Sequence, residues 1–130
     1  MMEQITDLPK GLWGFMVSGT VSSAEADPVL NAFDATAMTQ YDVALLMEFV
    51  GEVDLSQISE EERAYNRLMA RGRVRRFAFV ALPQFLSMYQ GFTAAMGCEC
   101  QMFQPGQRHD AIEWLKQADV VVGTGEPSQI

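Results

Sequence analysis

The sequence predicts a single α/β domain with a mixed, mostly parallel β-sheet of about five strands and four helices, in the order β-β-α-β-α-β-α-β-α. Segments 42–50 and 77–82 are apolar at nearly every position, which is typical of strands covered on both faces. They alternate with segments whose apolar residues recur every three or four positions, as in helices packed on a sheet. We expect 1–130 to form one domain, with 118–130 as a C-terminal tail.

Two strands are expected at the start of the chain. Segments 3–6 and 12–19 are separated by a turn that contains Pro9 and Gly11, two residue types that favour turns. The alternation of residues along the second strand places its largest apolar side chains on one face: Trp13, Phe15 and Val17.

The first helix is expected to begin near Ser22. Ser22 and Glu25 form an S-x-x-E capping box, which satisfies backbone N–H groups at a helix start. Pro28 is tolerated only in the first turn, so it also places the start near this point. The apolar stripe of this helix is Ala26, Val29, Leu30, Phe33 and Ala37.

The strand at 42–50 is expected to end in a loop from Gly51 to Ser59. A second helix then begins with a capping box formed by Ser59 and Glu62 and ends at Gly72. Ligand and switch sites of open α/β sheets gather at the carboxyl ends of strands, so this loop is a candidate site.

The second half of the chain continues the alternation. Strand 77–82 is followed by a helix that begins at Pro83 and ends at Gly97. Segment 98–103 alternates in polarity, which indicates a half-buried strand near an edge of the sheet. A last helix is expected over 108–117.

The charge of the chain is strongly segregated. The net charge is −8, but residues 1–62 carry −11 and residues 63–76 carry +6. The net negative charge argues against nucleic acid as a partner. The arginines form either a solvated helix face paired with nearby acids or a docking surface for an acidic protein partner or a second copy of the chain: Arg63, Arg67, Arg71, Arg73, Arg75 and Arg76.

The sequence suggests a cytoplasmic protein that is not an integral membrane protein. No apolar run approaches the roughly 20 residues that span a bilayer. The first ten residues have neither the basic start nor the apolar core of a signal peptide.

Few residues suggest catalysis or metal binding. His109 stands beside Asp110 at the polar start of the last helix, where a solvated histidine is expected. Cys98 and Cys100 face the same side of a strand, and a structural metal site would need further ligands. We therefore expect two thiols that pack as small apolar groups, no metal, no cofactor and no enzymatic activity.

Glu48 is the most unusual charged residue, because its strand alternation places it on an apolar face. Either it reaches solvent or a backbone N–H at the strand end, or it is the polar anchor of a small apolar pocket. Phe49 lies at the same strand end, and the nine methionines could line an adaptable pocket. A third hypothesis is an enzyme in which Glu48 and Glu52 act as paired carboxylates.

Four segments together resemble the SpoIIAA-like proteins of the STAS superfamily, whose fold is related to the CRAL-TRIO lipid-binding domains: GFMVSGTVSSAEADPVLNAF, VALLMEF, RVRRFAFVAL and CECQMF with AIEWLKQ. The resemblance covers residues 3–117. It implies a mixed sheet with helices against it, a homodimer and no catalysis.

The resemblance also implies a place for a switch. Sporulation members are switched by phosphorylation of a serine in an Asp-Ser turn that follows a central strand. Here Leu55 separates Asp54 from Ser56, so the phosphoserine switch is not expected in this chain.

The sequence therefore predicts a non-enzymatic interaction or regulatory module without a phosphoserine switch motif. The alternative is a binder of a small apolar or lipid-like ligand. The candidate ligand- or partner-binding residues are Glu48, Phe49, Glu52, Ser56, Arg63, Arg67 and Arg71.

Overall fold

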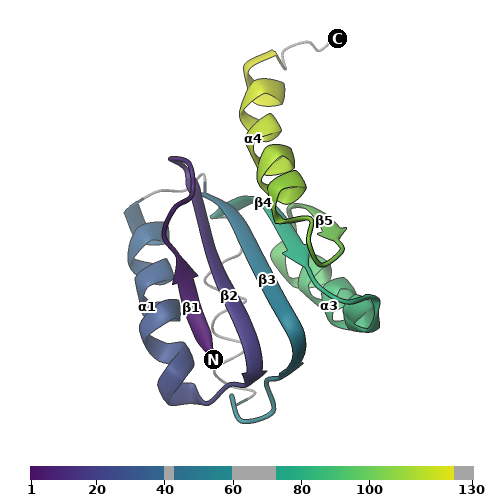
Figure 1. The fold of residues 1–130 in the computed structure, drawn as a ribbon. Coiled ribbons are helices and arrows are strands. Elements are labelled where there is room, and N and C mark those ends of the chain that lie inside the picture. The colour runs from purple at the N-terminus through teal and green to yellow at the C-terminus, as the bar shows by residue number, and fades with distance from the viewer. Residues whose placement is uncertain (40–42, 60–72, 125–130) are drawn as a thin grey trace.

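The computed structural model describes residues 1–39, 43–59 and 73–124, without the side chains of 37–39 and 118–124. One sheet has the strand order β1-β2-β3-β4-β5, with β1 antiparallel to β2 and all other neighbours parallel (Figure 1). The sheet is therefore mixed and mostly parallel, as expected. Its strands are β1 (Met2–Ile5), β2 (Leu12–Thr20), β3 (Val43–Asp54), β4 (Val74–Val80) and β5 (Glu99–Phe103).

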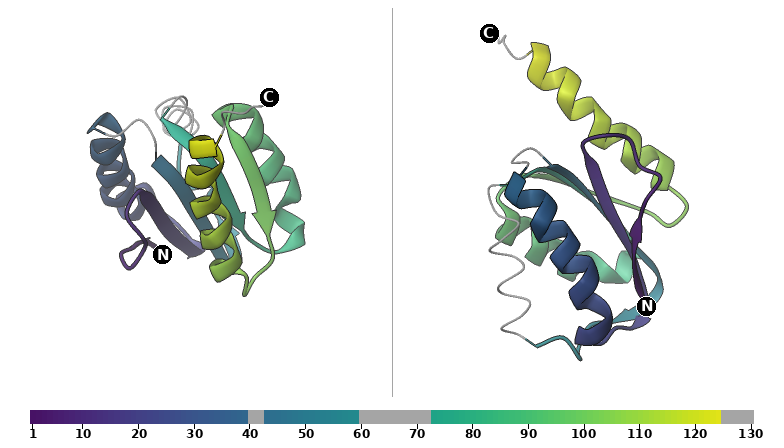
Figure 2. Two further views of the ribbon diagram at one scale, coloured as in Figure 1. Left: turned by 90° about the horizontal axis from the view of Figure 1, so that it is seen from above. Right: turned by 90° about the vertical axis from the view of Figure 1, so that its left-hand side faces the viewer.

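The described residues contain three α-helices rather than the expected four. They are α1 (Ser23–Thr39), α3 (Leu86–Met96) and α4 (Arg108–Thr124), and the short 3-10 helix η1 (Pro83–Phe85) precedes α3. Helices α1 and α3 cover one face of the sheet and α4 lies on the other (Figure 2). The helix expected between Ser59 and Gly72 lies outside the described residues.

Helix α1 begins with the expected capping box. The backbone N–H of Glu25 donates to Ser22 Oγ at 3.2 Å, and the N–H of Ser22 donates to Glu25 Oε1 at 3.3 Å. The restriction of Pro28 to the first turn was wrong, because α1 starts at Ser23 and Pro28 lies inside it. Pro28 is exposed, so water can reach the carbonyl group that its missing N–H leaves unbonded.

Strand β3 does not end at Val50, which corrects the expected loop from Gly51. Gly51 has a φ of 68°, a left-handed conformation that glycine adopts without steric cost. The pairing with β2 shifts at this point and then resumes, with Val53 opposite Gly19 and Asp54 opposite Thr20. Gly51 therefore makes a bulge within β3 rather than the start of a loop.

Strand β4 begins before Phe77, the expected first residue, because Arg76 is part of it. The Arg76 side chain is only 9% exposed, so a solvated helix face was the wrong interpretation for this arginine. Its guanidinium donates to Glu99 Oε1 at 2.8 Å and to the Trp114 carbonyl oxygen at 2.7 Å. It also lies 4.3 Å from the centre of the Trp114 ring, a cation–π contact.

Helix α4 continues to Thr124, so part of the expected tail at 118–130 is helical. Residues 118–122 contain neither Pro nor Gly, and valines lower helix propensity only slightly. The C-terminal part of α4 extends past the edge of the sheet (Figure 1). Among the described helices, none combines the length and the hydropathy needed to span a bilayer.

The sheet separates two hydrophobic cores. The core under α1 and α3 is rich in aromatic residues, including Trp13, Phe33 and Phe77, whereas the core under α4 contains Leu46, Val80 and Leu115. Strands β2 and β3 approach closely at Gly14, where a Cβ atom would lie 2.8 Å from Leu8 and 3.2 Å from Leu46. A larger residue at this position would displace the end of the Leu8 side chain and press on Leu46 in β3.

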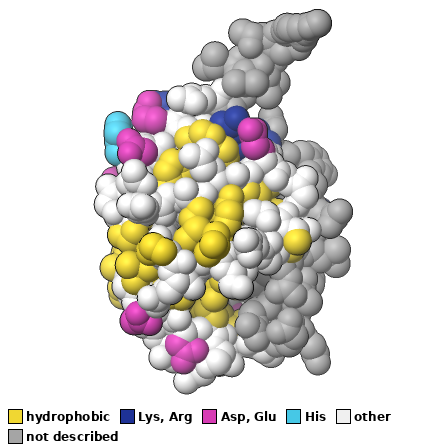
Figure 3. Space-filling model, turned by 90° about the vertical axis from the view of Figure 1, so that its right-hand side faces the viewer, with side chains coloured by type: hydrophobic (Ala, Val, Ile, Leu, Met, Phe, Trp, Pro, Cys, Tyr) yellow, Lys and Arg dark blue, Asp and Glu magenta, His cyan; other side chains and the backbone are white. Residues whose placement is uncertain are grey.

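Edge strand β5 begins at Glu99 rather than at the expected residue 98, so Cys100 lies in the strand and Cys98 just before it. It pairs only with β4, as expected for a half-buried edge strand, and hydrophobic side chains are visible on the side of the molecule where α3 and β5 lie (Figure 3). Cys98 and Cys100 are half-buried against the core under α3, with their Sγ atoms 3.9 Å apart. Burial, reinforced by Cys100, raises the pKa of Cys98 to about 12.

The contact between Arg76 and Glu99 can be tested by removing the carboxylate charge. Glu99→Gln should lower the free energy of unfolding by about 1–3 kcal/mol, because it leaves the buried Arg76 charge without a counter-charge. The control is Glu113→Gln, which disrupts an exposed ion pair with Lys116 and should cost less than about 0.5 kcal/mol. Equal losses in urea unfolding of the two variants would contradict a stabilising role for Glu99.

The raised pKa predicts that Cys98 reacts slowly with alkylating agents. At pH 8 iodoacetamide should modify Cys98 at least about tenfold more slowly in the folded protein than in urea, since only the thiolate reacts. The neutral thiol contributes stability below its unfolded pKa, and this contribution is lost as the pH rises towards 12. Mass spectrometry of the labelled peptides measures both rates, and equal rates would show that Cys98 is not shielded.

Candidate functional site

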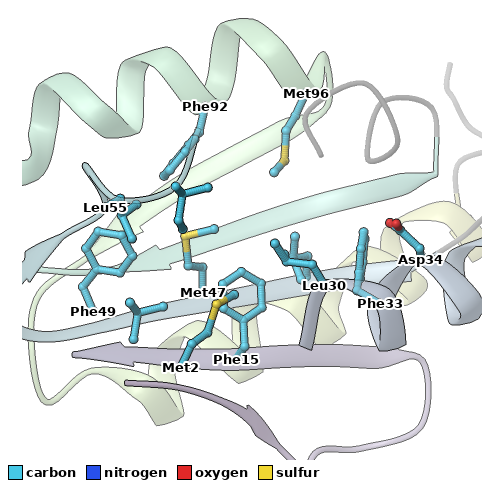
Figure 4. Close-up of a pocket in the computed structure, with 13 residues that line it drawn as sticks. Met2, Phe15, Leu30, Phe33, Asp34, Met47, Phe49, Leu55, Phe92 and Met96 are labelled. Carbon is cyan, nitrogen blue, oxygen red and sulfur yellow. The ribbon is translucent and has the colours of Figure 1, made fainter. Parts of the chain in front are cut away.

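A pocket of about 130 Å³ lies on the face of the sheet that α1 and α3 cover (Figure 4). Residues from the sheet, both helices and the segment after β3 line it. Among the described residues, twelve of the thirteen lining side chains are apolar, and Asp34 is the exception. These thirteen residues are Met2, Phe15, Val17, Leu30, Phe33, Asp34, Leu45, Met47, Phe49, Leu55, Ile58, Phe92 and Met96.

The floor of the pocket follows from strand alternation. The parallel register places Phe15 opposite Met47 and Val17 opposite Phe49, so their side chains share one face. The walls follow from helix periodicity instead. Helix α1 contributes residues at i, i+3 and i+4, and helix α3 contributes residues at i and i+4: Leu30, Phe33 and Asp34 from α1, and Phe92 and Met96 from α3.

A short turn after β3 brings two more apolar side chains to the pocket. The backbone N–H of Ser56 donates to Asp54 Oδ1 at 2.9 Å, and the N–H of Ile58 donates to the Leu55 carbonyl oxygen at 3.0 Å. Hydrogen bonds from Ser56, first from its side chain and then from its backbone, lower the pKa of Asp54. This turn positions Leu55 and Ile58 against the pocket.

Phe49, a predicted site residue, lines the pocket and is only 2% exposed. Its ring packs edge-to-face on Phe79 and Phe85, with centroid distances of 4.8 and 5.2 Å. These contacts fix the orientation of Phe49, so this end of the pocket has a rigid aromatic wall.

Asp34 is the polar residue of the pocket that sequence reasoning missed. Burial raises the pKa of its carboxyl group, and the positive charge of Arg73 opposes this effect. Among the described residues, none donates a hydrogen bond to the Asp34 carboxylate. The available signal was its spacing, since Asp34 stands four residues after Leu30 and beside Phe33 on the apolar side of α1.

Glu48, the favoured candidate from the sequence, lies on the opposite face of the sheet and does not line the pocket. Arg108 Nε donates to Glu48 Oε1 at 2.6 Å, and Arg108 also contacts the sulfur of Met16 at 3.7 Å. The Glu48 side chain is 13% exposed. This ion pair attaches the first turn of α4 to β3, which gives Glu48 a structural partner in place of a ligand.

The two other predicted site residues that the structure describes do not line the pocket. Glu52 is exposed and accepts a hydrogen bond from Gln84 at 2.8 Å, and exposed Ser56 forms the turn described above. Three of the predicted arginines lie outside the described residues: Arg63, Arg67 and Arg71.

A metal centre finds no support in the part of the chain that the structure describes. There, no three His, Cys, Asp or Glu side chains gather where they could hold an ion. His109 is exposed in the first turn of α4, as expected for a solvated histidine. The pocket is the candidate site, and the described residues that line it form an apolar surface with one carboxylate.

Comparison with known proteins places the fold in a family. The chain is similar in structure to an uncharacterised protein of the DUF3478 family from Shewanella loihica PV-4, solved by crystallography and described as having a SpoIIAA-like fold. The TM-score is 0.68 at 11% sequence identity, over 88% of this chain and 93% of that one. Comparison with curated proteins found no match. A model of the SpoIIAA-like family matches residues 12–116, so this chain belongs to the SpoIIAA-like family.

Proposed function

We propose that the protein is a non-enzymatic binding module that holds a small apolar ligand in the pocket between the sheet, α1 and α3. The observation that carries this proposal is an apolar space of about 130 Å³ in a layer that is otherwise packed with aromatic rings. The pocket is partly open, so apolar side chains that line it are accessible from outside. A ligand that filled it would remove apolar surface from water and gain contacts with those side chains.

The size of the pocket indicates the size of the ligand. An engineered apolar cavity of about 150 Å³ binds benzene, so the present pocket suits one aromatic ring or a chain of about six carbons. A longer lipid tail would have to continue outside the pocket. The volume therefore favours a small apolar compound over a lipid-like one.

The composition of the pocket supports a binding role. Met2, Met47 and Met96 come from β1, β3 and α3 and meet at the same space. Methionine side chains are unbranched and polarisable, so they adapt to ligands of different shape at low cost. Phe49 is held by its neighbouring rings, so the pocket combines one rigid aromatic side chain with several adaptable ones.

The carboxylates support binding rather than catalysis. General acid–base catalysis uses positioned groups within reach of a bound substrate. Glu48 is paired with Arg108 on the other face of the sheet, and Glu52 is exposed beside Gln84. Asp34 is the one titratable residue among the described side chains that line the pocket.

Two further hypotheses stay predictions. Docking of an acidic protein partner rests mainly on Arg63, Arg67 and Arg71, which lie outside the described residues. A homodimer is implied by the resemblance to the SpoIIAA-like proteins, and no contact in the described part of the chain bears on it. No observation on the described residues supports either hypothesis, whereas the pocket supports ligand binding.

The proposal predicts that toluene binds and that filling the pocket abolishes binding. Toluene at ten times its Kd should stabilise the protein by about 1.4 kcal/mol and raise Tm by a few degrees. Leu30→Trp places a bulky ring at the pocket wall and should remove this shift. Saturation-transfer NMR with toluene provides an independent measurement of binding.

The matched control is Ile112→Trp. Ile112 is also half-buried on a helix, but it packs on the core under α4. Both substitutions overpack a core at a cost of about 1–3 kcal/mol, so a general loss of stability would affect both. The proposal fails if wild-type protein shows neither a Tm shift nor saturation transfer, or if both variants bind toluene as the wild type does.

A further inference from the structure

The Asp34 carboxylate is an unusual component of an apolar pocket. It is partly buried, and none of the described residues donates a hydrogen bond to it. A bound molecule that covered this carboxylate would displace water from it, and a hydrogen-bond donor on that molecule would offset the loss. Within the described part of the chain, the carboxylate is therefore a hydrogen-bond acceptor that a ligand could use.

The position of Asp34 makes the two ends of the pocket chemically different. It lies at one end, away from Phe49 and Leu55 at the other end (Figure 4). A ligand lying along the pocket would place one end against the Phe49 ring and the other beside the carboxylate. The apolar part of the ligand and its polar head would thus meet different surfaces.

The charges around Asp34 indicate which head groups fit. Burial raises the pKa of the Asp34 carboxyl group, and the positive charge of Arg73 limits this rise. An ionised carboxylate only accepts hydrogen bonds, so it pairs with hydroxyl, amine or ammonium groups. A ligand carboxylate would be repelled by its like charge.

We infer that Asp34 is the specificity-determining residue of the pocket and selects small apolar ligands whose head group donates a hydrogen bond. This inference rests on the proposed function, because it concerns the same pocket. It separates aromatic or short aliphatic alcohols and amines, which are favoured, from the matching carboxylic acids, which are disfavoured. The apolar residues of the pocket determine the size of the ligand, and Asp34 determines its head group.

The test uses four probes that share one ring: toluene, benzyl alcohol, benzylamine and benzoate. Their Kd values for wild-type protein at pH 7 should fall into a clear order. Benzylamine and benzyl alcohol should bind about tenfold more tightly than toluene, because each adds a hydrogen bond to a charged acceptor. Benzoate should bind more weakly than toluene.

Two single substitutions on the same helix separate recognition from net charge. Asp34→Asn keeps the shape but removes the charge, so the preference for benzylamine over toluene should disappear while the Kd for toluene changes less than about twofold. Asp27→Asn removes the same charge from an exposed position of α1 that does not line the pocket, and it should keep the wild-type order. Thermal unfolding of each variant reports whether it is folded.

The outcomes distinguish the two levels of the proposal. If toluene binds but the four probes have equal affinities, or if Asp34→Asn keeps the wild-type order, the role of Asp34 is overturned while the pocket remains a binding site. If none of the probes binds wild-type protein, both the proposed function and the role of Asp34 are overturned. The wild-type order alone also tests the inference, because tight binding of benzoate would contradict it even if Asp34→Asn did not fold.

Discussion

The burial of β3 on both faces is the constraint on which the rest of the structure depends. Successive side chains of a strand point to opposite faces, so the covered residues of β3, from Val43 to Phe49, alternate between the two layers. Met47 and Phe49 face the pocket, whereas Leu46 and Glu48 face α4. The parallel register of β2 and β4 with β3 extends this division across the sheet. If the pairing of β3 slipped by one residue, Glu48 would face the pocket, and Met47 and Phe49 would face α4.

Features that depend on local chemistry could be predicted from the sequence. The apolar runs identified the central strands, and the capping box at Ser22 placed the start of α1. The errors arose where a distant partner decides the outcome. A buried arginine in a strand is unfavourable unless partners compensate its charge. Glu99 and Trp114 do so for Arg76, but both are distant in sequence, so the sequence did not place Arg76 in β4. The bulge at Gly51 likewise depends on β2. Residues 53 and 54 belong to β3 only because they pair with residues 19 and 20 of β2.

The candidate site was predicted in part, for the same physical reason. Strand periodicity correctly separated Glu48 from Phe49, but it could not tell which face held a pocket. The location of the pocket depends on how α1 and α3 pack on the sheet. A periodic sequence pattern predicts neither the angle between these helices nor the space between them. Asp34 was overlooked because one polar residue beside an apolar stripe is ordinary in an amphipathic helix. Only the packed structure shows that its carboxylate reaches the pocket wall.

The two faces of the sheet are stabilised in different ways, and this difference bears on function. Helix α4 is attached by directional contacts at both Arg108 and Trp114, and ion pairs of this kind tolerate little displacement. The pocket face is held by aromatic and methionine contacts, which are not directional and change their arrangement at low cost. A ligand can therefore be accommodated under α1 and α3 without disturbing the contacts of α4. The side of α1 and α3 is therefore the more adaptable part of the domain, whereas the ion pair and hydrogen bond of α4 hold the other side in place.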